Sequence, residues 1–179
     1  MAGQGTPIAP KHVAELLQVA STALRTEMAA LREPLLSWHP ASGEWCAKEV
    51  VGHLIEAEQR GFAGRIRQIL AAPEAPRFAT WDPAEVARAR RDCERELDGL
   101  LGQFGALRDA SVSLVESLQT ADLGRGGQHP SVGHLRIGDL LHEWVHHDRN
   151  HLRQILANVQ AFVWPHMGNA QRFSRPEVV

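Results

Sequence analysis

One stripe of side chains near the C-terminus limits the fold more than any other feature of this 179-residue sequence. Its members are spaced by four, three, four and four positions: Leu140, Trp144, His147, His151 and Ile155. Such spacings place side chains on one face of an α-helix, which turns once in about 3.6 residues. Apolar residues flank the two histidines, so this face is expected to pack into a core. A long helix is therefore predicted from about Arg136 to Phe162.

Three earlier segments have the same apolar periodicity. The predicted helices run from Lys11 to about Arg32, from about Trp45 to Ala71, and from about Pro83 to about Leu118. Gly102 and Gly105 are expected to kink or break the third of these helices. No segment shows the sustained alternation of apolar and polar residues that is typical of a strand. These patterns predict an all-α fold.

Long connections separate the predicted helices at two points. Residues 72–83 contain three prolines, and residues 120–133 are rich in glycine. Four helices with such connections favour a four-helix bundle with crossovers over an up-and-down bundle with short loops. Residues 1–10 are interpreted as a flexible N-terminal arm, 11–164 as the bundle and 165–179 as a C-terminal tail.

Composition narrows the classes of function. A hydrophobic fraction of 44% is ordinary for a globular protein, and a formal net charge of −2 argues against a nucleic-acid partner. No apolar run approaches the roughly 20 residues that span a membrane. The first residues lack a secretory signal, so a cytoplasmic protein without membrane contact is expected. Cys46 and Cys93 lie far apart and lack a CxxC spacing, so two reduced thiols are the simpler expectation.

Three histidines are candidate metal ligands. His147 and His151 lie one helical turn apart on an apolar face and can bind one ion. His53 shares a face of the second predicted helix with Val50 and Ala57, so it is also expected to point inward. The alternative for each is a core histidine with one hydrogen bond. Two adjacent buried imidazoles without a shared partner would, however, leave polar nitrogens unsatisfied.

Four further residues are candidates for orienting the ligands or lining a pocket, because they lie near the histidines at helical spacing: Glu49, Glu56, Glu143 and Trp144. Such carboxylates would hold the imidazole rings in place. The alternative for the three carboxylates is a surface position, and the alternative for Trp144 is core packing.

A second metal motif overlaps the fourth predicted helix. Residues 142–146, HEWVH, match the HExxH pattern of zinc metallopeptidases. His142 and His146 share their face with Arg149 and Arg153, which is typical of a solvent-exposed surface. The glycine and histidine of the extended motif are absent downstream. We therefore interpret the match as a coincidence of spacing.

Two motifs resemble a known family. Residues 45–58, WCAKEVVGHLIEAE, and residues 147–155, HDRNHLRQI, look like the DinB superfamily, as does the preceding segment HPSVGHLRIGDLLHEW. The similarity is to its metal-binding branch, which is related to the bacillithiol and mycothiol S-transferases. The resemblance implies a four-helix bundle of up-down-down-up connectivity. It also implies a nickel, zinc or iron ion on three histidines, which by position are His53, His147 and His151.

Three neutral imidazoles leave open positions on an ion, which can then activate water, a thiol or a carbonyl group. The resemblance implies a metal-dependent thiol S-transferase that uses a low-molecular-weight thiol as the first hypothesis. A metal-dependent hydrolase is the alternative, and a stress-related metal- or ligand-binding protein without turnover is the third. Each hypothesis expects a small-molecule ligand, and the resemblance also implies a homodimer.

Overall fold

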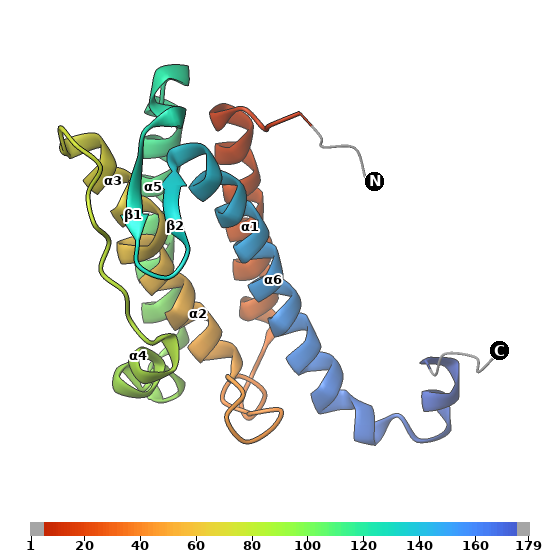
Figure 1. Cartoon of the computed structure of the whole chain (residues 1–179). Coiled ribbons are helices and arrows are strands. Elements are labelled where there is room, and N and C mark those ends of the chain that lie inside the picture. The colour runs from red at the N-terminus through yellow and green to blue at the C-terminus, as the bar shows by residue number, and fades with distance from the viewer. Residues whose placement is uncertain (1–5, 175–179) are drawn as a thin grey trace.

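The helical periodicity of the sequence becomes a four-helix bundle in the computed structural model, which describes residues 6–174 (Figure 1). The bundle consists of α1 (Pro10–Ala30), α2 (Ala47–Glu56) continued by η1 (Ala57–Gly61) and α3 (Phe62–Ala71), α5 (Leu97–Ser117), and α6 (Ile137–Val163). Each predicted helix has a counterpart among these segments. The predicted fold class is confirmed.

The order of the helices explains the long connections. α1 packs against α5 and α6, and the segment from α2 to α3 packs against the same two helices. Residues 72–82 return along the bundle, so α5 runs parallel to α2 and α3 (Figure 1). α6 then runs parallel to α1. This is the up-down-down-up connectivity that the resemblance implied.

The buried apolar side chains form two clusters, one toward each end of the bundle. α6 contributes Leu140 and Trp144 to the first cluster and Ile155 to the second. His147 and His151 lie between these positions on the same helix. The stripe that was visible in the sequence therefore crosses from one apolar cluster to the other, with its two histidines at the junction.

The third predicted helix is interrupted at a point that the apolar pattern did not indicate. α4 (Pro83–Arg90) ends at Arg91, whose φ of 50° lies in the left-handed region, and η2 (Asp92–Glu94) precedes α5. α5 continues through Gly102 and Gly105. The expected kink or break at these two glycines is therefore wrong.

Burial of Asp92 explains the position of the break. Only 1% of Asp92 is exposed, and its carboxylate lies against Gly52 of α2, where a Cβ atom would collide with it. Arg90 Nε and Arg95 Nη1 lie 2.6 and 2.9 Å from the carboxylate oxygens. Residues two apart do not face each other on a helix, so the contact between Arg90 and Asp92 requires the helix to end.

The second predicted loop contains a β-hairpin. After η3 (Thr120–Gly124), β1 (Gly126–His129) pairs antiparallel with β2 (Gly133–Arg136). Strands of four residues are too short for a recognisable alternation, so the all-helical expectation missed them. Phe78 of the linker lies against Gly127, where a Cβ atom would meet the ring. The hairpin contacts α3 and α6, so it lies beside the helix that carries His147 and His151.

The segments at the two ends of the chain lie outside the four helices of the bundle. Residues 1–5 of the expected N-terminal arm lie outside the described part, and the backbone N–H of Ile8 donates to His142 Nε2 at 3.0 Å. After α6, η4 (Trp164–His166) and η5 (Gly168–Ser174) form 3-10 turns. The expected tail lies outside the described residues from position 175 onward. Among the helices of residues 6–174, none is long and apolar enough to cross a membrane.

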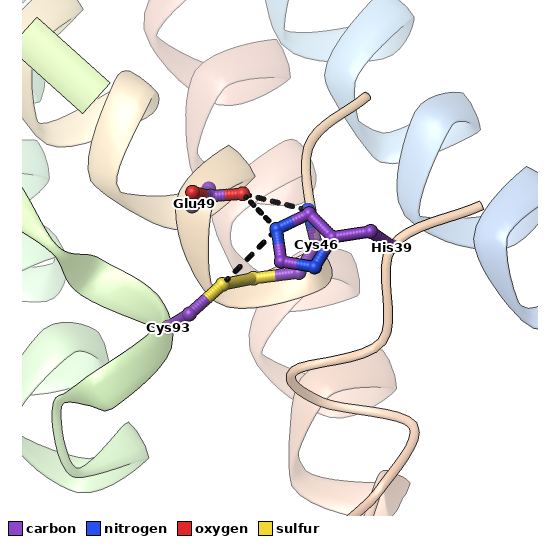
Figure 2. Close-up of side chains that lie close together, drawn as sticks. All are labelled: His39, Cys46, Glu49 and Cys93. Atoms are coloured by element: carbon purple, nitrogen blue, oxygen red, sulfur yellow. Dashed lines mark hydrogen bonds and ion pairs between the residues drawn. A yellow bond between two sulfur atoms is a disulfide. The ribbon is translucent and has the colours of Figure 1, made fainter. Parts of the chain in front are cut away.

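Cys46 and Cys93 form a disulfide, so the expectation of two reduced thiols is wrong for this structure (Figure 2). Cys46 directly precedes α2, and Cys93 lies in η2, 47 residues later. The packing of η2 against α2 brings the two side chains together. Because this contact depends on the break after α4, spacing in the sequence could not reveal it.

Candidate metal centre

Three histidines, called the histidine triad below, meet where α2 faces α6. His53 lies in the last turn of α2, and His147 and His151 lie on successive turns of α6. One ring nitrogen from each can be chosen so that all three lie within 4.8 Å of one another. His53 Nε2 is 3.0 Å from His147 Nε2. The structure therefore brings together the three residues that the sequence selected.

Neighbouring residues explain the inward orientation of the triad. Trp144 and Ile155 are fully buried and determine the face of α6 from which His147 and His151 project. On α2, the buried Val50 and Leu54 flank His53. The π-turn η1 then begins one turn after His53. Such turns are often found at functional sites, because they change which side chains point inward.

Aromatic rings surround the triad. The ring centroid of Trp45 lies 4.8 Å from that of His53 and 6.2 Å from that of His151. Phe62 meets the edge of His147 at 5.1 Å and stacks on Trp144, also at 5.1 Å. These apolar surroundings disfavour a positive charge on the imidazoles.

Burial keeps two of the imidazoles neutral. It lowers the pKa of His53 to about 3, and the neighbouring rings of His151 and His147 act in the same direction. It also lowers the pKa of His151 to about 4, again with help from His147. The neutral imidazole is the form that binds metal ions. His151 Nδ1 donates to Gln154 Oε1 at 2.9 Å, which leaves a lone pair on His151 Nε2.

Two buried atoms beside the triad have no hydrogen-bond partner among the described residues. They are His147 Nδ1 and Asp148 Oδ1, which lie 4.0 Å apart. If His147 presents Nε2 to an ion, its hydrogen is on Nδ1, and this carboxylate is the nearby acceptor. The donor set of three imidazoles with a carboxylate behind one of them fits a divalent transition metal ion.

Asp148 also belongs to a buried ion cluster with Arg108 and Glu58. Arg108 of α5 is fully buried, and it lies 2.5 Å from Asp148 Oδ2 through Nη1 and 2.5 Å from Glu58 Oε1 through Nη2. Burial raises the pKa of Glu58 in spite of the Arg108 charge. Burial opposes ionisation of Asp148 too, but Arg108 and His147 outweigh it and hold the pKa of this carboxyl below its ordinary value. The cluster ties α5 and η1 to the helix that carries two of the histidines.

A cavity of about 690 Å³ adjoins the triad. Its lining includes His53, His147 and Phe62, and continues to Trp81 and to Leu135 of the hairpin. A volume of this size is typical of small-molecule binding sites, and so is a largely apolar lining with a few polar groups. The linker and the hairpin, which sequence reasoning treated as loops, thus form walls of the cavity.

Arg65 is the cationic residue that lines this cavity. Its guanidinium carbon lies 5.1 Å from the centre of a Trp81 ring and 5.5 Å from the Phe78 ring. Burial lowers the pKa of Arg65, and its Nε has no partner among the described residues. A buried donor of this kind is satisfied by an acceptor that enters the cavity.

Comparison with known proteins agrees with this geometry. A family model described as the DinB superfamily matches residues 16–155, a range that contains the whole histidine triad. This chain belongs to the DinB superfamily. The resemblance seen in the motifs around His53 and His147 is thereby confirmed.

Two similar proteins cover most of this DinB chain. One from Bacillus licheniformis is 28% identical over 156 residues, which are 86% of each chain. One from Oceanobacillus iheyensis is 27% identical over 124 residues, which are 69% of this chain and 70% of that protein. Both carry the provisional name of metal-dependent hydrolase.

Two solved structures share the fold of this DinB protein. YfiT from Bacillus subtilis has a TM-score of 0.79 at 18% identity, and the match covers 91% of this chain and 96% of YfiT. It is provisionally described as a metal-dependent hydrolase with an unusual four-helix bundle topology. The four-helix bundle protein TT2238 has a TM-score of 0.61 at 18% identity over 83% of this chain and 99% of its own.

Two of the predicted orienting residues of this DinB protein make their contacts elsewhere. Glu49 lies 3.0 Å from His39 and caps the start of α2. Glu56 is 5% exposed and pairs with Arg60 and Arg90. Within residues 6–174, neither carboxylate is hydrogen-bonded to an imidazole of the triad. Asp148 is the carboxylate beside His147 instead.

The other two candidates, Glu143 and Trp144, differ in their exposure to solvent. Glu143 is exposed and lines the cavity, one helical turn before His147. Trp144 is fully buried in the first apolar cluster, where it stacks on Phe62. Trp144 therefore packs the core of the DinB bundle, as the alternative interpretation had it.

The HExxH pair does not join the triad. His146 is exposed and its ring nitrogen contacts Asn150. His142 is half-buried, since its Nδ1 donates to the Gly138 carbonyl at 2.7 Å and its Nε2 accepts from Ile8. His142 is therefore only partly exposed to solvent, whereas a fully solvent-exposed face was expected. Neither histidine belongs to a group of three metal-ligating side chains within the described part of the chain.

Sequence reasoning missed the ion cluster. Arg108 follows Phe104 by four residues and precedes Val115 by seven, and both apolar residues are buried. This spacing could have indicated an arginine on a buried helix face. Its partners, Glu58 and Asp148, come from two other helical segments and carry no comparable signal.

Proposed function

We propose that this protein is a metal-dependent hydrolase of a small molecule, with a divalent transition metal ion held by the histidine triad. The observation that carries the proposal is that His53 and His147 both line a cavity of about 690 Å³. The names of the two similar proteins support the same reaction class. An ion on these ligands would supply Lewis-acid activation of water or of a substrate carbonyl group.

Glu143 is proposed to act as the general base and general acid. It lies on α6, one turn before His147, and it lines the cavity. An exposed carboxylate at this position can accept a proton from the attacking water and return it to the leaving group. Phe62 and Trp45 limit the access of bulk water to the histidines from the sides that they cover.

Arg65 is proposed to position the substrate. Its stacking on Trp81 and Phe78 holds the guanidinium in place at the cavity, and its Nε is free to donate a hydrogen bond. A guanidinium binds carboxylates and other oxygen acceptors well. The site is therefore suited to a substrate with an apolar body and an anionic or carbonyl oxygen.

A second reaction fits the same cavity. Its volume leaves room for a low-molecular-weight thiol beside an electrophile, which is the S-transferase chemistry that the resemblance implied. In that case Glu143 would accept the proton of the thiol. The two reactions differ in whether they need an added thiol.

One assay distinguishes these functions. Metal content is measured first, and the metal-loaded protein is then incubated with esters, amides and electrophiles, with and without a low-molecular-weight thiol. Hydrolysis without thiol that is lost in His147→Ala supports the hydrolase. Consumption of thiol together with an electrophile would replace the hydrolase by the S-transferase. Metal binding with no turnover of any of these compounds would favour the binding protein without catalysis.

A further inference from the structure

A second group of metal-ligating side chains lies around the disulfide. It consists of His39, Cys46, Glu49 and Cys93, called the cysteine cluster below (Figure 2). Each contributes one ligand atom, and these atoms all lie within 4.8 Å of one another. His39 Nε2 lies 3.0 Å from Glu49 Oε2 and 3.7 Å from Cys93 Sγ. Three separate segments therefore direct a nitrogen, an oxygen and two sulfurs at one point.

The cysteine cluster is separate from the triad but close to it. Trp45, whose ring contacts His53 and His151, immediately precedes Cys46 in the chain. Cys46 is buried, whereas 44% of the His39 side chain and 17% of the Glu49 side chain are exposed. The cluster is thus open to solvent on the His39 side, so a reductant or an ion can reach it.

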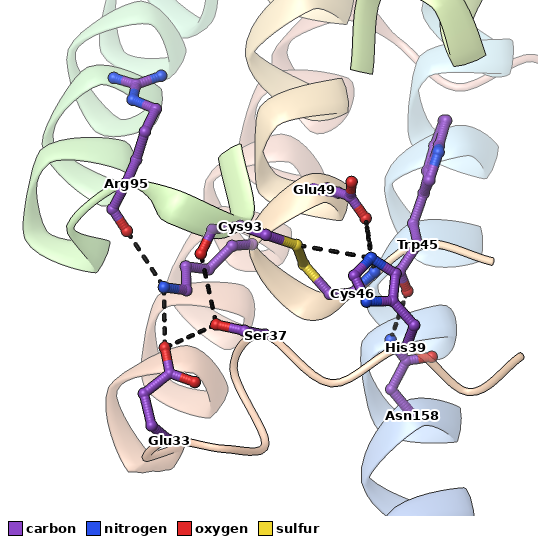
Figure 3. Close-up of a disulfide and its surroundings, with 10 residues drawn as sticks. Glu33, Ser37, His39, Trp45, Cys46, Glu49, Cys93, Arg95 and Asn158 are labelled. Atoms are coloured by element: carbon purple, nitrogen blue, oxygen red, sulfur yellow. Dashed lines mark hydrogen bonds and ion pairs between the residues drawn. A yellow bond between two sulfur atoms is a disulfide. The ribbon is translucent and has the colours of Figure 1, made fainter. Parts of the chain in front are cut away.

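Contacts other than the disulfide hold the two cysteine-bearing segments together (Figure 3). Ser37 Oγ lies 2.8 Å from Glu33 Oε1 and 3.4 Å from the carbonyl oxygen of Cys93. Lys48 Nζ pairs with Glu33 at 2.8 Å and donates to the carbonyl oxygen of Arg95 at 3.2 Å. These contacts tie the Cys93 carbonyl of η2 and the Arg95 carbonyl just after it to residues before and after Cys46. The two sulfurs would therefore stay close after the disulfide opens.

We propose that reduction of the Cys46–Cys93 disulfide creates a zinc site with four protein ligands. A dithiol reductant would transfer two electrons and two protons, so that the S–S bond breaks, two thiols form and the reductant becomes a disulfide. Zn²⁺ then binds the two sulfurs, His39 and Glu49, and the two thiol protons are released to solvent. Thiolate, imidazole and carboxylate groups each bind zinc in proteins, and four such ligands complete a tetrahedral site.

The oxidised and zinc-bound forms exclude each other. In the disulfide each sulfur is bonded to the other, so neither is available as a thiolate. Either form cross-links the start of α2 to η2, and both would keep Trp45 beside the triad. The chain would therefore retain this cross-link in reducing conditions when zinc is present and lose it when zinc is absent.

The test uses the full-length His147→Ala protein, in which the triad is disabled and the cysteine cluster is the remaining group of three or more metal-ligating side chains among residues 6–174. The protein is stripped with a chelator and titrated with Co²⁺ as a spectroscopic probe, before and after reduction by a phosphine. The expected result is one equivalent of Co²⁺ bound only after reduction, with the near-ultraviolet absorption of a sulfur–cobalt bond. Addition of Zn²⁺ should remove this absorption.

Three variants in the same background locate the site. Cys93→Ser should abolish the sulfur–cobalt absorption. His39→Ala, which leaves the disulfide intact, should weaken binding by more than the roughly 10–100-fold cost of losing an outer-shell partner. His12→Ala, at an exposed histidine of α1, should leave it unchanged. The proposal is overturned if reduction adds no metal equivalent, or if Cys93→Ser or His39→Ala binds Co²⁺ as the parent does.

Discussion

His53 Nε2 lies 3.0 Å from His147 Nε2, although 94 residues separate them in the chain. The two nitrogens face each other because α2 and α6 pack together at the junction of the two apolar clusters. Two ring nitrogens at this distance share a hydrogen that one donates to the other, or direct their lone pairs at a common cation. His151 adds a third nitrogen within reach of the same cation.

Replacing His147 with alanine should abolish metal binding by the triad, while replacing His146 should leave it nearly unchanged. His147 lies against His53, whereas His146 is exposed and contacts Asn150. Calorimetric titration of the oxidised apo-protein with Zn²⁺ or Ni²⁺ measures both affinities. Retained binding in His147→Ala, or loss in His146→Ala, would overturn the assignment of the ligands.

The metal-free protein should lose stability as the pH falls below about 6.5. Burial lowers the pKa of His53 to about 3 and that of His151 to about 4, from an ordinary value of 6.5. Between these values the unfolded chain binds protons that the folded protein does not, so acid favours unfolding. The loss is at most about 1.4 kcal/mol per pH unit for each histidine.

Urea unfolding of chelator-treated protein between pH 4 and 7 measures this dependence. His53→Gln should flatten the curve, because it removes one of the two groups. The His146→Ala variant provides a control with an exposed histidine removed, and its curve should match that of the parent. Stability that stays constant over this range would contradict the prediction.

Arg108→Met should destabilise the fold by about 3–5 kcal/mol, because it leaves Glu58 and Asp148 buried without a cation. The free energy of unfolding in urea measures the loss. Adding Glu58→Gln to this variant should restore part of the stability, since one buried carboxylate is then removed. If the double variant is less stable than Arg108→Met, the charge explanation is wrong.

Gly52→Ala should destabilise the protein by about 1–3 kcal/mol, because its Cβ atom would collide with the buried Asp92 carboxylate. Gly102→Ala is the matched control, since a Cβ atom there meets nothing within 4 Å. That change should stabilise α5 by up to about 1 kcal/mol through helix propensity. Thermal unfolding of the two variants should therefore shift in opposite directions.

Arg65→Met should raise the KM for an anionic substrate while leaving the metal affinity of the triad unchanged. Arg65 lines the cavity, and its guanidinium is held by stacking on Trp81 and Phe78. Kinetics with a matched pair of anionic and neutral substrates measure the effect. An equal loss for both substrates would show that Arg65 does not recognise the anionic group.

Much of the fold and of the triad was predictable because it rests on local periodicity. The four-residue spacing of His147 and His151 places them on one helix face, and the flanking apolar residues indicate which way that face points. The same reasoning applies to His53 on α2. Helix α6 was predicted to within about a residue at each end, since its pattern is long and regular.

Other features were decided by contacts between distant segments. Helix α4 ends at Arg91 because Asp92 turns inward against Gly52. The apolar periodicity of residues 83–118 does not indicate that contact. The disulfide and the cysteine cluster depend on this break, because it places Cys93 beside the start of α2.

The sequence by itself determined the helices, the inward face of each, and through these faces the histidines that meet at the centre of the bundle. Only the tertiary structure decided what surrounds them. The carboxylate beside His147, the arginine that neutralises it, and the linker and hairpin that wall the cavity come from separate segments. The physical reason is the range of the interactions. Helical periodicity depends on residues a few positions apart in the sequence. The partner of a buried charge or of a disulfide-bonded cysteine, in contrast, is a distant residue that the packing of the helices brings near.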